Sequence, residues 1–368
     1  MRNFGVFFKR FFSFIICYLL CISVGAVPTL SAKSAILINA DTGEVILEYN
    51  ADERRGMAST TKIMTAIIAI ESEKLDNTFT IPNEATGIEG SSLYLKSGES
   101  LTLRELVTGL MLQSANDAAE AIAIIVGGNV DSFVDMMNKK SLDWGLKNTH
   151  FANPHGLASD DHYTTARELA IIASYAIKNK SFQEICSMRT ASIPGTDYTR
   201  HITNHNKMLT IYEGAYGIKT GFTKATGRCL VSAARRNGVN LIAVTLNAPN
   251  DWKDHKLLLD YGFSSIECVD LAFSGQLISS IPIFGGTLNS TSVYIKNDVS
   301  VYLKKNRNSI VEKIEINHPQ FAPVYQGDEV GRIVFYLDGL EIASSPLCAS
   351  TYIGTPQKNK SFFEKIFS

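Results

Sequence analysis

The sequence predicts a two-domain protein of the α/β (α+β) class: a larger domain with an antiparallel sheet and a helical cluster, then a small all-β domain. The chain has 368 residues, enough for about two domains with separate cores. Its hydrophobic content of 45% and charged content of 19% exclude collagen-like, disordered and multi-span membrane classes. Strand-like and helical segments are mixed up to about residue 264, whereas only short strand-like segments follow.

The larger domain is predicted over residues 33–264 from the period of its apolar residues. Two strands joined by a turn at 41–43 come first, at Ser34–Asn39 and Glu44–Glu48. Helices are expected where apolar residues recur every three to four positions, at Ser59–Glu71, Leu103–Leu112, Asp117–Val126, Thr165–Asn179 and Trp252–Tyr261. Three more strands are expected between glycines, at Tyr216–Lys219, Cys229–Ala234 and Asn240–Leu246.

The smaller domain is predicted over residues 265–350. Its apolar residues alternate as in half-buried strands, at Val293–Ile295, Val299–Leu303, Ile310–Ile316 and Arg332–Leu337. No combination of residues there suggests catalysis. We therefore expect the chemistry to lie in the larger domain.

Residues 1–32 have the features of a secretory signal peptide. A positively charged start is followed by an apolar run over 11–24 and then by small residues, at Gly25, Ala26, Ser31 and Ala32. The run is shorter than the roughly 20 residues that a spanning helix needs. We expect an exported, extracytoplasmic protein at the outer face of the cytoplasmic membrane or in the cell envelope. An uncleaved N-terminal anchor is the alternative.

Charge, cysteines and histidines exclude several other classes. Without residues 1–32 the chain has 32 basic and 36 acidic residues, so no nucleic-acid partner is expected. Four widely spaced cysteines remain, with no C-x-x-C pair, and we expect buried free thiols. His201 and His205 are four residues apart, but no Glu or Cys stands beside them at metal-ligand spacing. We expect structural or surface histidines, and neither a metal nor a cofactor.

Ser59 and Lys62 form the only S-x-x-K motif in the chain. Positions i and i+3 of a helix share one face, so the lysine amine can reach the serine hydroxyl. A serine becomes a good nucleophile when a neighbour takes its proton, and a lysine can do so if burial and a second cation lower its pKa. The motif alone is weak evidence, because it arises by chance about once or twice in a chain of this length.

Two later motifs strengthen the evidence. Ser114-Ala115-Asn116 offers a hydroxyl and an amide on a turn between two predicted helices. Lys219-Thr220-Gly221, at the end of a predicted strand, offers a cation and a hydroxyl beside a glycine that permits close backbone approach. The order S-x-x-K, S-x-N, K-T-G is much harder to obtain by accident.

With these motifs the chain resembles the low-molecular-mass penicillin-binding proteins of the serine D-alanyl-D-alanine carboxypeptidase family. The similarity spans nearly the whole chain after residue 32. It rests on the stretches around the three motifs and on 153–157, Asn-Pro-His-Gly-Leu. The resemblance implies a β-lactamase/transpeptidase-like catalytic domain and a β-rich second domain. The expected partners are peptidoglycan stem peptides that end in D-Ala-D-Ala, with β-lactam antibiotics as covalent inhibitors.

The resemblance also implies a role for each motif residue. Ser59 attacks the carbonyl between two D-alanines, and Lys62 accepts its proton. Ser114 relays a proton to the leaving amine, while Asn116 binds the substrate backbone or Lys62. The terminal carboxylate, or that of penicillin, binds Lys219 and Thr220 beside Gly221. The backbone N–H groups of Ser59 and Phe222 form the oxyanion hole.

Some features of the sequence depart from relatives or leave alternatives open. The middle motif is S-A-N rather than S-D-N, and no Glu-x-x-Leu-Asn segment is found, which argues against a class A β-lactamase. Phe222 stands where some relatives carry histidine. A D,D-endopeptidase or a β-lactamase on the same scaffold, or a catalytically idle wall-binding or β-lactam-binding protein, remain alternatives. Arg200 is interpreted as either a carboxylate ligand or a surface residue.

The tail, residues 351–368, combines apolar and basic residues. Four large apolar side chains lie among its last eight positions, with three lysines nearby, at Lys358, Lys360 and Lys365. As an amphipathic segment it is expected to make peripheral contact with a membrane surface. The alternative is a terminus that docks on its own domain.

Overall fold

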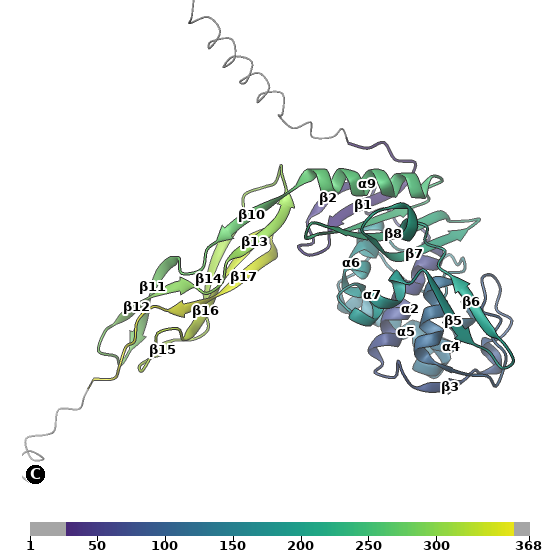
Figure 1. Ribbon diagram of the computed structural model, residues 1–368, viewed down its shortest axis with the longest axis horizontal. Helices are drawn as coiled ribbons and strands as arrows, with labels where there is room; N and C mark the ends of the chain where they lie inside the picture. The colour runs from purple at the N-terminus through teal and green to yellow at the C-terminus, as the bar shows by residue number, and fades with distance from the viewer. Residues whose placement is uncertain (1–26, 357–368) are drawn as a thin grey trace, which may run out of the picture.

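The computed structural model describes residues 27–356, which form two domains set end to end (Figure 1). The predicted signal sequence up to residue 26, and the apolar part of the predicted tail after residue 356, lie outside the described residues. The observed classes are those expected: an antiparallel sheet packed with helices, followed by an all-β domain.

A five-stranded antiparallel sheet organises the larger domain. The strands lie in the order β2-β1-β9-β8-β7. Their bounds are β1 Ser34–Asn39, β2 Val45–Tyr49, β7 Ala215–Thr223, β8 Gly227–Arg236 and β9 Val239–Leu246. Every neighbouring pair is antiparallel. Strand β7 therefore forms an edge of the sheet, where a further extended chain can pair with it.

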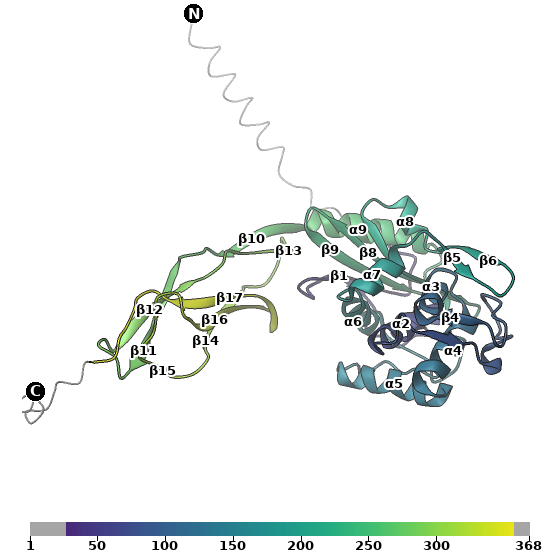
Figure 2. The ribbon, with the colours of Figure 1, turned by 60° about the horizontal axis from the view of Figure 1, so that its bottom comes forward.

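Helices cover both faces of this sheet (Figure 2). The larger group lies on one face and comprises α2 Lys62–Glu71, α3 Leu103–Leu112, α4 Asn116–Gly127, α5 Val130–Asp143, α6 Ala166–Ala176 and α7 Lys180–Ser187. On the other face lie α8 Met208–Ile211 and α9 Asp251–Ser265. Successive side chains of a strand point to opposite faces of the sheet and so belong to two separate apolar cores. Ile36 packs in the core under the six helices, whereas Leu37 packs in the core under α9.

Short elements surround the helical cluster. They are the 3-10 helices η1 Ala58–Thr61 and η2 Asn83–Ala85, and the strands β3 Thr78–Thr80, β4 Ser100–Thr102, β5 Thr190–Pro194 and β6 Thr199–Thr203. Strands β5 and β6 form a hairpin, and β3 pairs with β4. Thr102 and Glu105 make reciprocal hydrogen bonds that cap the start of α3.

The structure differs from the predicted elements in several places. Strand β7 continues to Thr223 instead of ending at the K-T-G motif, so Gly221 lies within a paired strand. Helix α4 already begins at Asn116. Helices α5 and α7 and the small strands were not expected. In α5 the buried side chains Phe133, Met137 and Ser141 are spaced four residues apart, on one face of the helix.

The smaller domain consists of β-strands alone. Strand β10, Ile266–Ala272, follows α9 directly and pairs with β13, Val299–Lys304. The remaining strands form a sheet in the order β14-β16-β17-β12-β11-β15, with bounds β11 Leu277–Phe284, β12 Ser290–Ile295, β14 Val311–Ile316, β15 Gln320–Phe321, β16 Glu329–Leu337 and β17 Leu340–Ala349. Cys268 is exposed on β10, contrary to expectation, whereas Cys186, Cys229 and Cys348 are buried free thiols.

Polar contacts join the domains beside the α9–β10 connection, and two of them reach β13. The side-chain amide of Asn39 donates to the carbonyl of Tyr302 at 2.6 Å, and the amide of Lys304 donates to a Glu44 carboxylate oxygen at 2.8 Å. The Tyr302 carbonyl and the Lys304 amide both belong to β13. The end of the sheet in the larger domain is thus tied to the first strand pair of the smaller one.

Residues just before β1 are part of the folded domain. The backbone amides of Ser31 and Ala32 each donate to the Asp254 carboxylate at 3.0 Å, and the Ser31 hydroxyl donates to it at 2.7 Å. Asp254 lies on α9 and is only 2% exposed. Ser31 and Ala32 therefore donate the hydrogen bonds that the buried Asp254 carboxylate needs, on the side of the sheet opposite the helical cluster.

Within residues 27–356, no helix combines the length and the apolar character needed to cross a membrane. In the same range, no three His, Cys, Asp or Glu side chains gather in a way that could hold a metal ion.

Candidate active site

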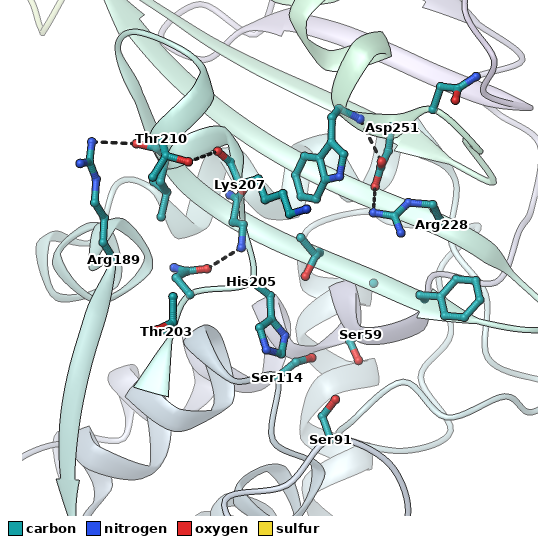
Figure 3. A pocket seen from close by; sticks show the side chains of 18 of the residues that line it. Ser59, Ser91, Ser114, Arg189, Thr203, His205, Lys207, Thr210, Arg228 and Asp251 are labelled. Carbon is teal, nitrogen blue, oxygen red and sulfur yellow. Dashed lines mark hydrogen bonds and ion pairs between the residues drawn. The ribbon is translucent and has the colours of Figure 1, made fainter. Parts of the chain in front are cut away.

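Ser59 lies in η1, against the edge strand β7 (Figure 3). Ala58 before it has a φ of +47°, a conformation that a residue with a side chain seldom adopts. Two glycines make room for this turn. A Cβ on Gly156 would lie 2.0 Å from the Ala58 carbonyl oxygen, and one on Gly221 would lie 3.0 Å from the Ser59 nitrogen. The backbone at Ser59 is thus fixed by close packing from both sides.

Lys62 is the first residue of α2, and its side chain reaches Ser59 as the spacing predicted. Its Nζ lies 2.9 Å from the Ser59 Oγ, 2.7 Å from the Asn116 Oδ1 and 2.5 Å from the His155 carbonyl oxygen. The residue is completely buried. All three polar neighbours are uncharged, so the amine has hydrogen bonds without a carboxylate in direct contact.

Burial lowers the pKa of Lys62 well below that of a free lysine. The positive charge of Lys219 lowers this pKa further, whereas the negative charge of Asp117 acts in the opposite direction. The neutral amine, which can accept a proton, therefore forms more readily than in a free lysine.

Ser114 and Asn116 lie at the junction of α3 and α4. Ser114 has a φ of +60°, and its side chain lines the same cavity as Ser59. The Asn116 amide group bridges two segments, since its Oδ1 accepts from Lys62 and its Nδ2 donates to the Glu89 carbonyl at 2.5 Å. The S-x-N motif is thus held by the loop before β4 on one side and by Lys62 on the other.

Lys219 and Thr220 come from β7. Lys219 is 1% exposed, and burial lowers its pKa to about 7. Its Nζ donates to the Thr220 carbonyl oxygen at 3.1 Å. Thr220 and Gly221 line the cavity, and Phe222 stands at its rim with 62% of its surface exposed. The three predicted motifs therefore meet around Ser59.

The cavity at Ser59 has a volume of about 1180 Å³ and extends along β7. Of the predicted site residues, Ser59, Ser114, Thr220, Gly221 and Phe222 line it. The remaining three, Lys62, Asn116 and Lys219, are buried beneath it. At the other end the cavity passes between α8 and the start of α9, where Arg228 forms an ion pair of 2.9 Å with Asp251.

Five basic residues of the cavity wall were not predicted as site residues. They are Arg189 just before β5, His205 and Lys207 between β6 and α8, Arg228 on β8 and Lys253 on α9. Figure 3 shows the His205 ring next to Ser114. Burial, and then the charge of Lys219, lower the pKa of His205. His205 is exposed, as expected of a surface histidine, but no local motif marks its place on the cavity wall.

Arg200 is neither a carboxylate ligand of the cavity nor a surface residue. It is 6% exposed, and its guanidinium binds both carboxylate oxygens of Glu99 at 2.7 and 2.9 Å. It also donates to the Leu93 carbonyl oxygen at 2.8 Å. The arginine joins the β5–β6 hairpin to the loop before β4.

Comparison with protein families gives two matches along the chain. Residues 23–250 match the D-alanyl-D-alanine carboxypeptidase family. Residues 267–354 match the family described as penicillin-binding protein 5, C-terminal domain.

Individual relatives match over most of their length. A D-alanyl-D-alanine carboxypeptidase of Escherichia coli, DacA, is 33% identical and covers 93% of this chain and 88% of its own. DacF of Bacillus subtilis is 32% identical, with coverage of 86% and 85%. Among solved structures, penicillin binding protein 5 of Haemophilus influenzae has a TM-score of 0.70 at 29% identity, covering 89% of this chain and 98% of that one. The PBP3 structure of Streptococcus pneumoniae has a TM-score of 0.76 at 25% identity, covering 89% and 100%.

Proposed function

The chain belongs to the D-alanyl-D-alanine carboxypeptidase family of serine hydrolases, and from that premise we propose that it removes the terminal D-alanine of peptidoglycan stem pentapeptides through an acyl-enzyme on Ser59. The observation that carries this proposal is the Ser59–Lys62 contact of 2.9 Å at a completely buried lysine. Residues 33–264 are the proposed catalytic domain, and residues 265–350 are the proposed β-rich accessory domain.

The neighbours of Lys62 fix the direction of proton transfer. A neutral lysine amine has two N–H groups and one lone pair. The Asn116 Oδ1 and the His155 carbonyl oxygen can only accept hydrogen bonds, so they take the two N–H groups. The lone pair is then directed at the Ser59 hydroxyl. Lys62 accepts the serine proton while the Ser59 Oγ attacks the carbonyl carbon of the penultimate D-alanine.

Lys219 and Thr220 bind the carboxylate of the departing D-alanine. Both lie on the edge strand, which can pair with an extended peptide. The substrate carboxylate also supplies the counter-charge that buried Lys219 lacks. Ser114, on the cavity wall, passes a proton from Lys62 to the leaving nitrogen. The backbone N–H groups of Ser59 and Phe222 stabilise the oxyanion, each donor contributing about 3 kcal/mol.

Water completes the cycle by hydrolysing the ester on Ser59. A β-lactam presents a carboxylate and a strained amide in the same relative positions, so it acylates Ser59 through the same contacts. The missing Glu-x-x-Leu-Asn segment favours slow hydrolysis of that adduct and inhibition by the drug.

A D,D-endopeptidase activity is the second candidate, and one observation favours it. The cavity does not end at Thr220 but continues to Lys207 and Arg189, on the side where the leaving group departs. A single D-alanine fills little of a cavity of 1180 Å³. A leaving group that belongs to a second stem peptide would use this space and its positive charges.

We also propose that the protein is exported and that cleavage of the signal peptide occurs before Leu30. Ser31 and Ala32 hold the Asp254 carboxylate, which supports assigning them to the mature chain. The residues after 356 are proposed to rest on a membrane surface. Vesicles that contain anionic lipid should co-sediment the full mature chain, whereas a chain that ends at residue 356 should stay in solution.

D-alanine release from an acyl-D-Ala-D-Ala peptide tests the activity directly. The chain from Val27 onward should release D-alanine, and its Ser59→Ala variant should release none. Equal release by both would contradict the mechanism. Release by neither, together with cleavage of cross-linked peptide dimers, would favour the endopeptidase.

A further inference from the structure

Glu120 has a buried oxygen that the proposed mechanism does not use. It lies on α4, four residues after Asn116, so both side chains project from one face of the helix. Its Oε2 is buried and has no hydrogen-bond partner among the described residues. The His155 Nε2 lies 3.9 Å from this oxygen. An unpartnered buried carboxylate oxygen is costly and calls for an explanation.

The other ring nitrogen of His155 determines what faces Glu120. The backbone amide of Leu157 donates to the His155 Nδ1 at 3.2 Å, so Nδ1 carries no proton. The neutral ring therefore carries its proton on Nε2, toward Glu120. Burial, and then the charge of Lys62, lower the pKa of His155 to about 4, and so the ring stays neutral at working pH.

The backbone of His155 contacts the reaction centre. Its carbonyl oxygen accepts from the Lys62 Nζ at 2.5 Å. The turn that carries it is further closed by the Gly156 amide, which donates to the Asn153 Oδ1 at 2.7 Å. One helix thus reaches both acceptors of Lys62, directly with Asn116 and through the His155 ring with Glu120.

We propose that Glu120 is a positioning residue: through the Nε2–H of His155 it holds the 153–157 turn so that the His155 carbonyl and Asn116 together orient the lone pair of Lys62 toward Ser59. At 3.9 Å the carboxylate and the polarised N–H attract each other without a direct hydrogen bond, where solvent screening is weak. This inference rests on the proposed role of Lys62 as the base.

Other charged groups also act on Lys62 and must stay constant in a test. They are Lys219 on β7 and Asp117 on α4, while the nearby ring of His162, whose pKa is lowered to about 3, stays neutral over the pH range of the test. Glu120→Leu removes a carboxylate and lets the His155 carbonyl oxygen move away from Lys62. Both changes destabilise the protonated form of Lys62. Its pKa then falls, although the lone pair is no longer aimed at Ser59.

The test follows acylation of Ser59 by benzylpenicillin in the full mature chain, from pH 5 to pH 10, by mass spectrometry. In the parent, the acylation rate should rise with pH and then reach a plateau. In Glu120→Leu this rise should occur at lower pH, and the rate at the plateau should fall about tenfold. Glu120→Gln keeps an oxygen whose partial negative charge faces the His155 Nε2–H, so its plateau should stay within about threefold of the parent. Glu184→Leu, on α7, is the matched control and should change neither.

A double variant separates positioning from general loss of packing. If Glu120 acts through His155, then Glu120→Leu with His155→Gln should be no slower than the slower single variant. The inference would be overturned if the rate losses of the two single variants multiply in the double variant. It would also be overturned if Glu120→Leu keeps the plateau rate of the parent, or lowers that rate without shifting the pH at which acylation rises. Acylation that survives in Ser59→Ala or Lys62→Ala would instead contradict the proposed function, whatever Glu120 does.

Discussion

The two domains treat charged side chains in opposite ways. The catalytic domain buries many of them, among them Lys62, Asp117, Lys219, Asp251 and Asp254. In the described part of the β domain the buried polar residues are only Ser265, Thr291 and Ser345, none of which is charged. Its charges pair at the surface, where Arg332 contacts both Glu315 and Glu341. Both domains have an apolar core, so a core alone does not need buried charge.

The contrast shows what the reaction requires of the fold. Taking an ammonium group out of water is unfavourable unless it is paired or loses its proton. Two buried lysines near each other have their pKa values lowered for that reason, and Lys62 thereby becomes a base. The two buried lysines therefore make the catalytic domain less stable but more reactive, and the described part of the β domain has no buried lysine.

Removal of Lys62 should give the largest effect. In Lys62→Ala the Ser59 hydroxyl keeps its proton, so the rate of acylation by benzylpenicillin should fall by about a thousandfold or more. The folded state should persist, because an unfavourable buried amine has been removed. Lys224→Ala, on the exposed turn between β7 and β8, is the matched control. Acylation of Lys62→Ala within tenfold of the parent would show that another group takes the proton.

Lys219 should make the catalytic domain more stable as pH rises. Its pKa is about 7 in the folded state and near 10.5 in the unfolded chain. Between these values the unfolded state binds more protons, so the free energy of unfolding increases with pH, by up to about 5 kcal/mol. Lys219→Met should be more stable at pH 7 and lack this increase. Parallel curves for parent and variant in urea titrations from pH 7 to pH 10 would contradict the assignment.

Acid should weaken the catalytic domain before the β domain. Burial lowers the pKa of His255 and His162 to about 3 and that of His155 to about 4. The unfolded chain takes up these protons near pH 6.5, so stability is lost as pH falls from 6.5 toward 3. Calorimetry at pH 7 and pH 4 should show the catalytic transition lowered by about 10 °C or more, and the β-domain transition less affected. If the melting temperatures of both domains fall by the same amount, the two domains do not differ in their sensitivity to acid.

The segment before β1 should contribute a smaller stabilisation. A chain that starts at Lys33 loses the Ser31 and Ala32 contacts to Asp254, and its catalytic domain should lose about 2 kcal/mol. A chain that starts at Leu30 keeps these contacts and should match one that starts at Val27. If all three unfold at the same urea concentration, the segment adds nothing to the fold.

The surface ion pairs of the β domain should matter least. Arg332→Gln breaks contacts to Glu315 and Glu341, which are held in water, so the melting temperature of the β domain should not change measurably. A clear decrease would show that exposed charges support this domain after all, and would narrow the difference between the two domains.

The sequence predicted the site better than the elements around it. The i, i+3 spacing of Ser59 and Lys62 dictates their contact locally, and three motifs in order predicted which distant segments meet. Gly221 was misleading because glycine breaks isolated strands, yet here pairing with β8 and packing on Ser59 override that tendency. His205 could not be found, since its place on the cavity wall depends on how the segment between β6 and α8 folds back over α3.

The pH dependence of Ser59 acylation by saturating benzylpenicillin tests the central claim most directly, namely that buried Lys62 acts as a neutral base. The rate should rise with pH through a single pKa well below 10.5 and then reach a plateau. A rate that rises only near pH 10.5, where an ordinary lysine loses its proton, would contradict it.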